Sequence, residues 1–296
     1  DILRFNAEAP KELENAPDTL TLGAYLDGKQ YGQPFIENYI VPMGAAVWSA
    51  IPSMLLRFPA RYFVQFFSNH GFLKLKDRPV WRVVQGGSSA YIDPLIAPFR
   101  ERVHVDTPVR SLARREDGVE VCIDDAPPLL FDAAVVATHS DQALRLLADP
   151  SRVEREVLGA IPYQMNDTVL HTDARMMPRT RRAWAAWNYH VPATDDRPAT
   201  VTYDMNHLQS LDAEEDYFVT LNRTEEIDPA RILRRFRYAH PVYTPETRSA
   251  QHRKHEVNGV NRTWFCGAYW GYGFHEDGVK SALDVVRDFE RGGARA

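Results

Sequence analysis

The first quarter of the chain has the pattern of apolar helices. The stretch 39–56 carries no formal charge, but it contains Pro42 and Pro52. A membrane-spanning helix needs about 20 consecutive, predominantly apolar residues. Because this stretch is shorter, we interpret it as buried helices that break at the two prolines. A further helix is predicted over 59–70, with Pro59 at its first position and aromatic residues on several faces, which favours a place in the core.

The middle of the chain has the pattern of a strand, a glycine turn and a helix, followed by short strands. The run 80–84 predicts the strand, 85–87 the turn, and 91–99 the helix, because its apolar residues recur at helical spacing. The short strands are predicted at 103–105, 109–113, 118–123 and 131–138.

The turn residues at 116–118 indicate that the strands on either side of them form a hairpin. The run 131–138 is continuously apolar, as expected of a strand buried on both faces in a parallel sheet. A helix is predicted to follow it over 141–147.

The segment from 160 to 260 is rich in strand-forming residues and predicts an antiparallel or mixed sheet that is covered on one face. Its candidate strands are 167–172, 183–189, 199–203 and 217–221. The chain then has a strand at 263–266, a glycine-rich turn and a last helix over 277–291.

The composition is that of an ordinary soluble globular protein. The 296 residues include 35 Lys and Arg against 40 Asp and Glu, and 44% are hydrophobic. The length predicts two domains, and the net charge of −5 argues against a nucleic acid partner. The only cysteines, Cys122 and Cys266, form neither a disulfide framework nor a metal-binding pair, which favours a cytoplasmic protein.

The run 264–283 is the richest in candidate chemistry. Four glycines alternate with the aromatic residues Tyr269, Trp270, Tyr272 and Phe274 just before a predicted helix. Glycine lets a flat ligand approach the backbone, and the first N–H groups of a helix favour a partially negative ligand atom. The run therefore fits a large planar cofactor, and it equally fits a glycine-rich aromatic loop that packs on the core.

This run resembles the C-terminal flavin-binding motif of the flavin-containing amine oxidase and phytoene desaturase superfamily. Further segments are similar to the adenine-side strand and hairpin of that superfamily, to its strand that returns to the dinucleotide fold, and to the glycine turn before it. The adenine-side strand and hairpin correspond to 107–112 with 118–121, the returning strand to 131–138, and the glycine turn to 85–87.

The wider pattern resembles bacterial predicted NAD/FAD-binding, amine-oxidase-like proteins, and the resemblance covers nearly the whole chain. It rests on 170–173, 184–189, 240–244 and 267–278. A member of that group would have a first βαβ unit before Asp1, so the resemblance implies a fragment of a longer protein. The dinucleotide fingerprint G-x-G-x-x-G is absent from the 296 residues. Tyr269 stands where relatives have an acidic residue on the ribityl chain.

The resemblance implies an α/β fold with two intertwined domains. One is a partial FAD/NAD(P)-binding Rossmann-like domain made of 85–148, which holds the β-hairpin, and 259–296, which holds the C-terminal strand and helix. The other is a substrate domain made of a helical segment, 1–84, and the mixed or antiparallel sheet of 149–258.

The resemblance also implies FAD as cofactor and a set of site residues. The catalytic candidates are His275, Tyr269 and Trp270, where the aromatic residues would form a cage over the flavin and His275 would act as an acid or base. A hydrogen-bonded loop histidine is an equal interpretation of His275. The cofactor-binding candidates are Val109, Thr138, Gly267, Ala268, Gly273, Glu276, Asp277, Gly278 and Val279. Separately, the neighbours His171 and Asp173 form a candidate oriented base if their side chains share one face.

The expected reaction is removal of a hydride from a C–N or C–C bond by the flavin. The substrate stays open between an amine, which the aromatic cage would serve, and a lipid-like molecule, which the apolar 39–73 would suit at a membrane surface. The alternative is a non-catalytic fragment that binds an apolar ligand or a partner chain, including a second copy of itself, and does not hold FAD alone. A G-x-S-x-G hydrolase motif and an H-E-x-x-H metal motif are both absent.

Overall fold

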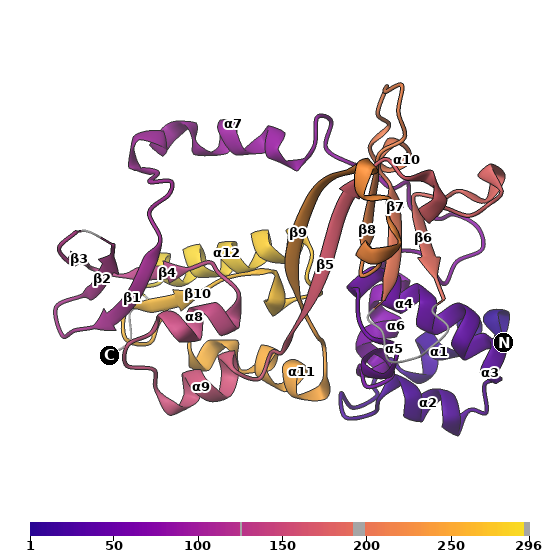
Figure 1. The fold of residues 1–296 in the computed structure, drawn as a ribbon. Coiled ribbons are helices and arrows are strands. Elements are labelled where there is room, and N and C mark those ends of the chain that lie inside the picture. The colour runs from indigo at the N-terminus through magenta and orange to yellow at the C-terminus, as the bar shows by residue number, and fades with distance from the viewer. Residues whose placement is uncertain (125, 192–198, 293–296) are drawn as a thin grey trace. The chain divides into compact units, whose positions relative to one another are not determined.

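The computed structural model describes residues 1–124, 126–191 and 199–292. The chain forms two compact units, each made of two segments (Figure 1). Unit 1 comprises Asp1–Arg100 and Gln164–Val242, and unit 2 comprises Glu101–Tyr163 and Tyr243–Ala296.

The first segment of unit 1 is helical, as the apolar pattern predicts. Its helices are α1 (Ile2–Glu12), α2 (Leu22–Gly28), α3 (Gln33–Phe35), the π-helix η1 (Ile36–Ile40), α4 (Val41–Trp48), α5 (Pro52–Leu55) and α6 (Ala60–Asn69). Pro52 begins α5 after the extended residue Ile51, where a missing N–H costs no helical hydrogen bond, so the predicted break there is confirmed. The predicted break at Pro42 is wrong, because Ile40 and Val41 keep helical dihedral angles and η1 continues directly into α4. No helix among the described residues is long and apolar enough to cross a membrane.

An aromatic cluster forms the core of this helical segment. Trp48 at the end of α4 contacts Phe66 of α6 with ring centroids 4.7 Å apart, and it also meets Phe58, Tyr62 and Phe63. Pro59 is the residue just before α6, one position earlier than predicted. The predicted burial of this helix is confirmed, since its aromatic side chains are all buried.

The second segment of unit 1 forms a five-stranded sheet in the order β6-β7-β8-β5-β9. Its strands are β5 (Tyr163–His171, whose first residue belongs to unit 2), β6 (Trp187–His190), β7 (Thr200–Asp204), β8 (Phe218–Leu221) and β9 (Ile232–Pro241). Short helices connect them: η4 (Ala174–Met176), η5 (Arg181–Ala183), α10 (Met205–Gln209), η6 (Thr224–Glu226) and η7 (Pro229–Arg231). Four of these strands were predicted, whereas β9 was missed because three arginines hide its alternation. β9 lies at one edge of the sheet, and an edge strand tolerates such charges.

Several predicted strands differ from the structure. The segments 80–84 and 103–105 form no strand, because neither finds a neighbouring strand to pair with. Trp81 instead packs edge-on against Trp187, with ring centroids 6.0 Å apart. The predicted strand 183–189 is shortened to β6, because its first residue ends the 3-10 helix η5.

A helical run that spans the boundary of the two units is exposed along most of its length, with Ile96 half-buried. It consists of η2 (Ser88–Tyr91), α7 (Ile92–Ile96) and η3 (Ala97–Arg102). None of its residues is buried, and apolar side chains such as Leu95 (65% exposed) and Phe99 (47%) face solvent.

Unit 2 contains an antiparallel three-stranded sheet and a parallel pair of strands. Its elements are β1 (Val109–Arg114), β2 (Val119–Ile123), β3 (Leu129–Phe131), β4 (Ala134–Val136), α8 (Ser140–Leu146), α9 (Arg152–Leu158), α11 (Pro245–His252), η8 (Lys254–Glu256), β10 (Thr263–Phe265), η9 (Ala268–Trp270) and α12 (His275–Glu290). The predicted hairpin is confirmed as β1 and β2. The predicted strand 131–138 divides, because Phe131 pairs with the hairpin while β4 pairs in parallel with β10.

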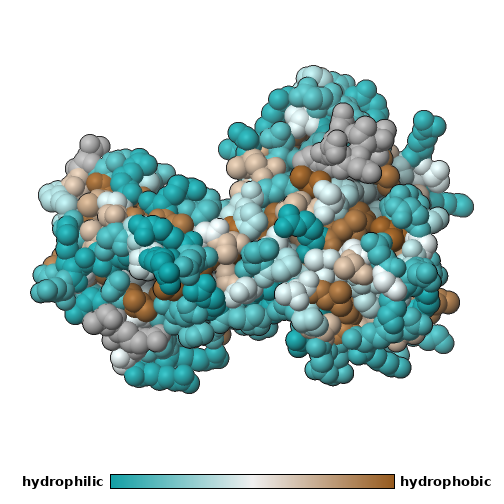
Figure 2. All heavy atoms as spheres, turned by 90° about the horizontal axis from the view of Figure 1, so that it is seen from below, coloured by the Kyte–Doolittle hydropathy of each residue, from teal (hydrophilic) through white to brown (hydrophobic). Residues whose placement is uncertain are grey.

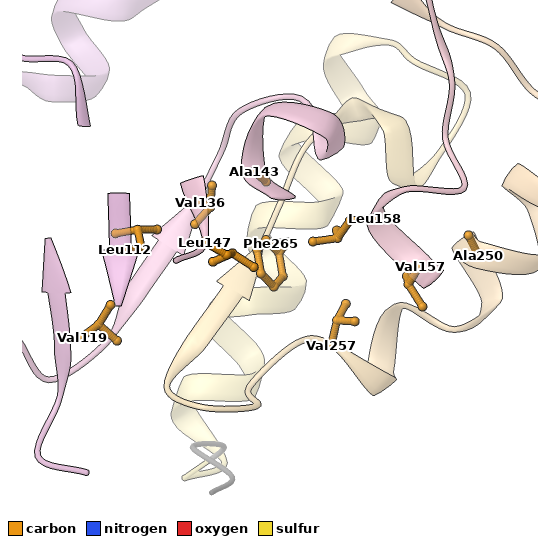
Figure 3. Close-up of a cluster of buried hydrophobic side chains, with 10 residues drawn as sticks. All are labelled: Leu112, Val119, Val136, Ala143, Leu147, Val157, Leu158, Ala250, Val257 and Phe265. Carbon is orange, nitrogen blue, oxygen red and sulfur yellow. The ribbon is translucent and has the colours of Figure 1, made fainter. Parts of the chain in front are cut away.

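The core of unit 2 gathers side chains from both of its segments. Phe265 of β10 lies in the middle of this cluster, with Leu147 and Leu158 pointing toward it (Figure 3). A buried ion pair between Arg114 of β1 and Glu154 of α9, 2.7 Å apart, borders the same region. On the face drawn in Figure 2, hydrophilic residues predominate and apolar residues form small groups among them.

Candidate functional site

The candidate site of unit 2 is built on the connection from β10 to α12. β10 ends at Phe265, and η9 turns the chain before α12 begins at His275. We call residues 267–274 the glycine–aromatic loop. All of its predicted partners in cofactor binding belong to unit 2 as well.

The end of the loop is fixed by the first turn of α12. The Oδ2 atom of Asp277 accepts hydrogen bonds from the backbone N–H groups of Tyr272 and Phe274, at 3.0 and 3.1 Å. Asp277 therefore uses its carboxylate to close the loop. A β-carbon at Gly271 would lie 2.2 Å from Oδ1 of Asp277, so the close approach of this carboxylate requires glycine there.

Gly273 is held in a conformation that other residues rarely adopt. Its φ is +94°, and a β-carbon would lie 2.6 Å from the hydroxyl oxygen of Tyr243, which is fully buried. Two independent reasons therefore require glycine at this position: the positive φ of the backbone and the close approach of the Tyr243 hydroxyl.

The beginning of the loop is fastened to α12 by Ser281. Its buried hydroxyl accepts from the N–H of Gly267 at 2.8 Å and donates to the carbonyl of Gly278 at 2.7 Å. A β-carbon at Gly278 would lie 3.9 Å from the backbone nitrogen of Ala268. The predicted residues Gly267, Ala268 and Gly278 are therefore immediate neighbours.

The aromatic residues of the loop occupy different environments. Tyr269 is 3% exposed, its ring lies against Gly267, and burial raises the pKa of its hydroxyl group. Trp270 is half-buried, and its indole N–H donates to the carbonyl of Phe265 at 2.9 Å. Tyr272 and Phe274 are half-buried at the other end of the loop.

The other predicted residues around the start of α12 are accessible. His275 and Glu276 are exposed in its first turn, and Glu276 lies 3.5 Å from Lys280. Val279, one turn along, is 54% exposed. These side chains leave the beginning of the helix open to a ligand.

Val109 and Thr138, predicted to contact the cofactor, line one cavity of about 740 Å³ in unit 2. Val109 begins β1 and Thr138 follows β4. The walls are mainly apolar side chains of β1, β2 and β4, and the polar groups include Gln142 and Arg145 of α8. The cavity fits a flat, mostly apolar ligand group.

Sequence reasoning missed several residues that support the loop. Gln251 of α11 donates from Nε2 to the carbonyls of Tyr269 and Gly271, at 2.7 and 2.8 Å. The side chain of Asn258 pairs with both the N–H and the carbonyl of Phe265, on β10. No sequence pattern marks these residues, because Gln251 acts on backbone groups 18 and 20 residues away and Asn258 on those of a residue seven positions away.

The structure contradicts the candidate base formed by His171 and Asp173. Both are buried in unit 1, but Nδ1 of His171 accepts from the backbone N–H of Asp173 at 3.1 Å, and Nε2 faces Thr220. The carboxylate of Asp173 binds Arg175 instead, which holds its pKa well below the usual range. Burial lowers the pKa of His171 to about 4. The pair is part of the folded core.

Residues 16–171 match the family model described as flavin containing amine oxidoreductase. Because this match covers more than half of the chain, the protein belongs to the family of flavin-containing amine oxidoreductases, which confirms the predicted superfamily.

Solved structures show the same fold. The chain is similar to putrescine oxidase bound to putrescine, with a TM-score of 0.69 and 12% identity, over 98% of this chain and 75% of that one. It is similar to a CLA-producing fatty acid isomerase from P. acnes (TM-score 0.64, 15% identity, 97% and 72% covered). It is also similar to cyclohexylamine oxidase from Brevibacterium oxydans IH-35A (TM-score 0.60, 12% identity, 98% and 74% covered).

The predicted α/β fold class, with a partial Rossmann-like domain and a sheet-containing second domain, is confirmed by these likenesses. A comparison with curated protein sequences finds no match. Within the part of the chain that the structure describes, no group of three or more His, Cys, Asp or Glu side chains could hold a metal ion.

Proposed function

We propose that this chain acts as an FAD-dependent oxidoreductase whose glycine–aromatic loop and α12 hold the isoalloxazine ring. The observation that carries the proposal is Gly278, which lies in the first turn of α12. Glycine inside a helix is less stable than alanine by about 1 kcal/mol. The backbone of Gly278 does not have a positive φ, and a β-carbon would meet its nearest neighbour only at 3.9 Å. Since the protein itself does not require glycine here, the close approach of a flat ligand explains it.

The proposed roles of the neighbouring residues follow from their positions. Flavin, when bound, would accept a hydride from a C–H bond of the substrate, and loss of a proton from the neighbouring nitrogen or carbon would leave a C=N or C=C bond. The first N–H groups of α12 favour negative charge on the ring, because the helix dipole is positive there. Tyr272 and Phe274 are proposed to contact the substrate, and exposed His275 to exchange a proton with it. Tyr269 and Trp270 were predicted to contact it too. Burial of Tyr269 favours a role in supporting the loop, and so does the hydrogen bond from the indole of half-buried Trp270 to the Phe265 carbonyl.

The adenine end of FAD is proposed to enter the cavity lined by Val109 and Thr138, whose apolar walls suit a flat base. The fingerprint that would bind the pyrophosphate is absent from the 296 residues. We therefore expect the chain by itself to hold FAD weakly.

The substrate is proposed to be a small amine or a lipid-like molecule. Putrescine oxidase and cyclohexylamine oxidase are named for amines, and the fatty acid isomerase for a lipid. The carboxylates beside the loop are already engaged, Asp277 by backbone N–H groups and Glu276 by Lys280. An amine would therefore be recognised through the aromatic side chains rather than by an ion pair.

The experiment that tests this function adds FAD to the purified chain and records its visible absorption together with hydrogen exchange of the backbone. We expect shifted flavin bands and slower exchange over 267–279 and around Val109. Unchanged bands and unchanged exchange at saturating FAD would overturn the claim that this chain holds a flavin.

A second function is favoured by the exposed helical run Ser88–Arg102. Ile92, Leu95 and Phe99 are all at least 47% exposed, which places apolar surface in contact with solvent. We propose as the alternative that this surface binds an apolar ligand or a second copy of the chain, with no catalysis. Sedimentation of the wild type and of a Leu95→Glu, Phe99→Glu variant tests self-association. The alternative predicts a concentration-dependent dimer that the variant abolishes, and a wild-type monomer at all concentrations would contradict self-association.

A further inference from the structure

We propose that Gln251 is the positioning residue of the glycine–aromatic loop, and that it sets the affinity of the loop for the isoalloxazine ring. The second claim, on flavin affinity, rests on the proposed function. Gln251 lies on α11, which is distant in sequence from the loop, and its side chain is buried.

The carboxamide of Gln251 can take only one orientation. Nε2 lies 2.7 Å from the carbonyl oxygen of Tyr269 and 2.8 Å from that of Gly271, and neither oxygen can donate a hydrogen. Oε1 lies 2.5 Å from Nη1 of Arg248, and a guanidinium cannot accept one. Both N–H bonds of the amide therefore point at the loop, and Arg248 prevents the amide from flipping.

This clamp acts on the stretch of the loop that lies between two other side-chain supports. Ser281 fastens Gly267 at the beginning, and Asp277 fastens Tyr272 and Phe274 at the end. Gln251 holds the carbonyls between them. The turn of Ala268–Trp270 is thereby fixed beside Gly278, where the flavin is proposed to lie.

The test is Gln251→Glu, which replaces two donors by a carboxylate oxygen that repels both carbonyls. The unit 1 residue Gln164 offers a matched control, because its Nε2 likewise donates to the Ser49 carbonyl and to the side-chain oxygen of Asn166. Backbone hydrogen exchange of 268–274 is measured without flavin, and FAD affinity is measured by titration. Loss of two hydrogen bonds is expected to speed exchange and to weaken FAD binding, each by about tenfold or more. Gln164→Glu should leave both unchanged.

The exchange rate and the FAD affinity of Gln251→Glu test separate parts of the proposal. Unchanged exchange in the loop of Gln251→Glu would overturn the clamp, and faster exchange with unchanged FAD affinity would overturn its link to the flavin. If the wild type binds no flavin, the proposed function fails while the exchange measurement still decides the clamp. Should Gln251→Glu not fold, the isosteric and uncharged Gln251→Met serves the same comparison.

Discussion

The hydroxyl oxygen of Ser281 accepts a hydrogen bond from the backbone N–H of Gly267 at 2.8 Å. This bond joins the turn that follows β10 to the second turn of α12. It therefore fixes the beginning of the loop against the helix. The geometry of the candidate site therefore depends on a side chain that touches no proposed ligand.

Ser281→Ala should destabilise the fold, because it leaves the Gly267 N–H in a partly buried place without its acceptor. We expect a loss of about 1–3 kcal/mol in the free energy of unfolding, measured by urea denaturation. Ser68, exposed on α6, provides the control, since Ser68→Ala should change stability by less than about 0.5 kcal/mol. Equal stabilities of the two variants would show that the Ser281 bond contributes nothing.

Gly273→Ala should be more harmful than a typical glycine substitution. The φ of +94° strains any side chain, and the added carbon would meet the Tyr243 hydroxyl at 2.6 Å. We expect a loss of about 2 kcal/mol or more, measured as a lower melting temperature.

Two comparisons separate strain from collision at Gly273. Gly292 has a φ of +75°, and no atom of the described residues lies within 4 Å of its missing β-carbon, so Gly292→Ala should cost only about 1–2 kcal/mol. Adding Tyr243→Phe to Gly273→Ala removes the colliding oxygen and should recover some of the loss. No recovery in the double variant would contradict the proposed collision.

The stability of the protein should fall as the pH drops from 6.5 toward 4. Burial lowers the pKa of His171 from 6.5 to about 4, so in this range the unfolded chain binds a proton that the folded chain does not. Linkage then predicts a loss of up to about 3 kcal/mol, complete near pH 4. Unfolding measured across this range should show the slope, and it should be smaller in His171→Gln. An identical slope in that variant would assign the effect to other groups.

The elements that the sequence predicts best are those specified by neighbouring residues. The hairpin of β1 and β2 follows from the turn at Glu116–Gly118, and β4 pairs in parallel as its continuous apolar run predicts. The predicted burial of that run on both faces is wrong, because Val135 of β4 is 48% exposed. The strand β9 and the segment 80–84 were misjudged for one shared reason. A strand exists only where a partner offers hydrogen bonds, and neither the arginines of β9 nor the valines of 80–84 reveal that partner.

The residues of the candidate site also fall into those that neighbouring residues mark and those that only the fold brings into place. Gly267, Gly273 and Gly278 were predicted because glycines cluster with aromatic residues before a helix. Gln251 binds carbonyls of the loop, Asn258 binds the backbone of Phe265 just before it, and the Tyr243 hydroxyl lies beside Gly273. These contacts exist only after folding, so no spacing in the sequence marks them.

The central claim is that Gly278 makes room for a flavin, and titration of Gly278→Ala with FAD, beside its thermal unfolding, tests it most directly. Alanine should stabilise α12 by about 0.5–1 kcal/mol, because the site has space for a β-carbon and helix propensity favours it. The same carbon should weaken FAD binding by about tenfold or more. A variant that is more stable and binds FAD less tightly is the result we predict. A more stable variant that binds FAD as tightly as the wild type would contradict the account.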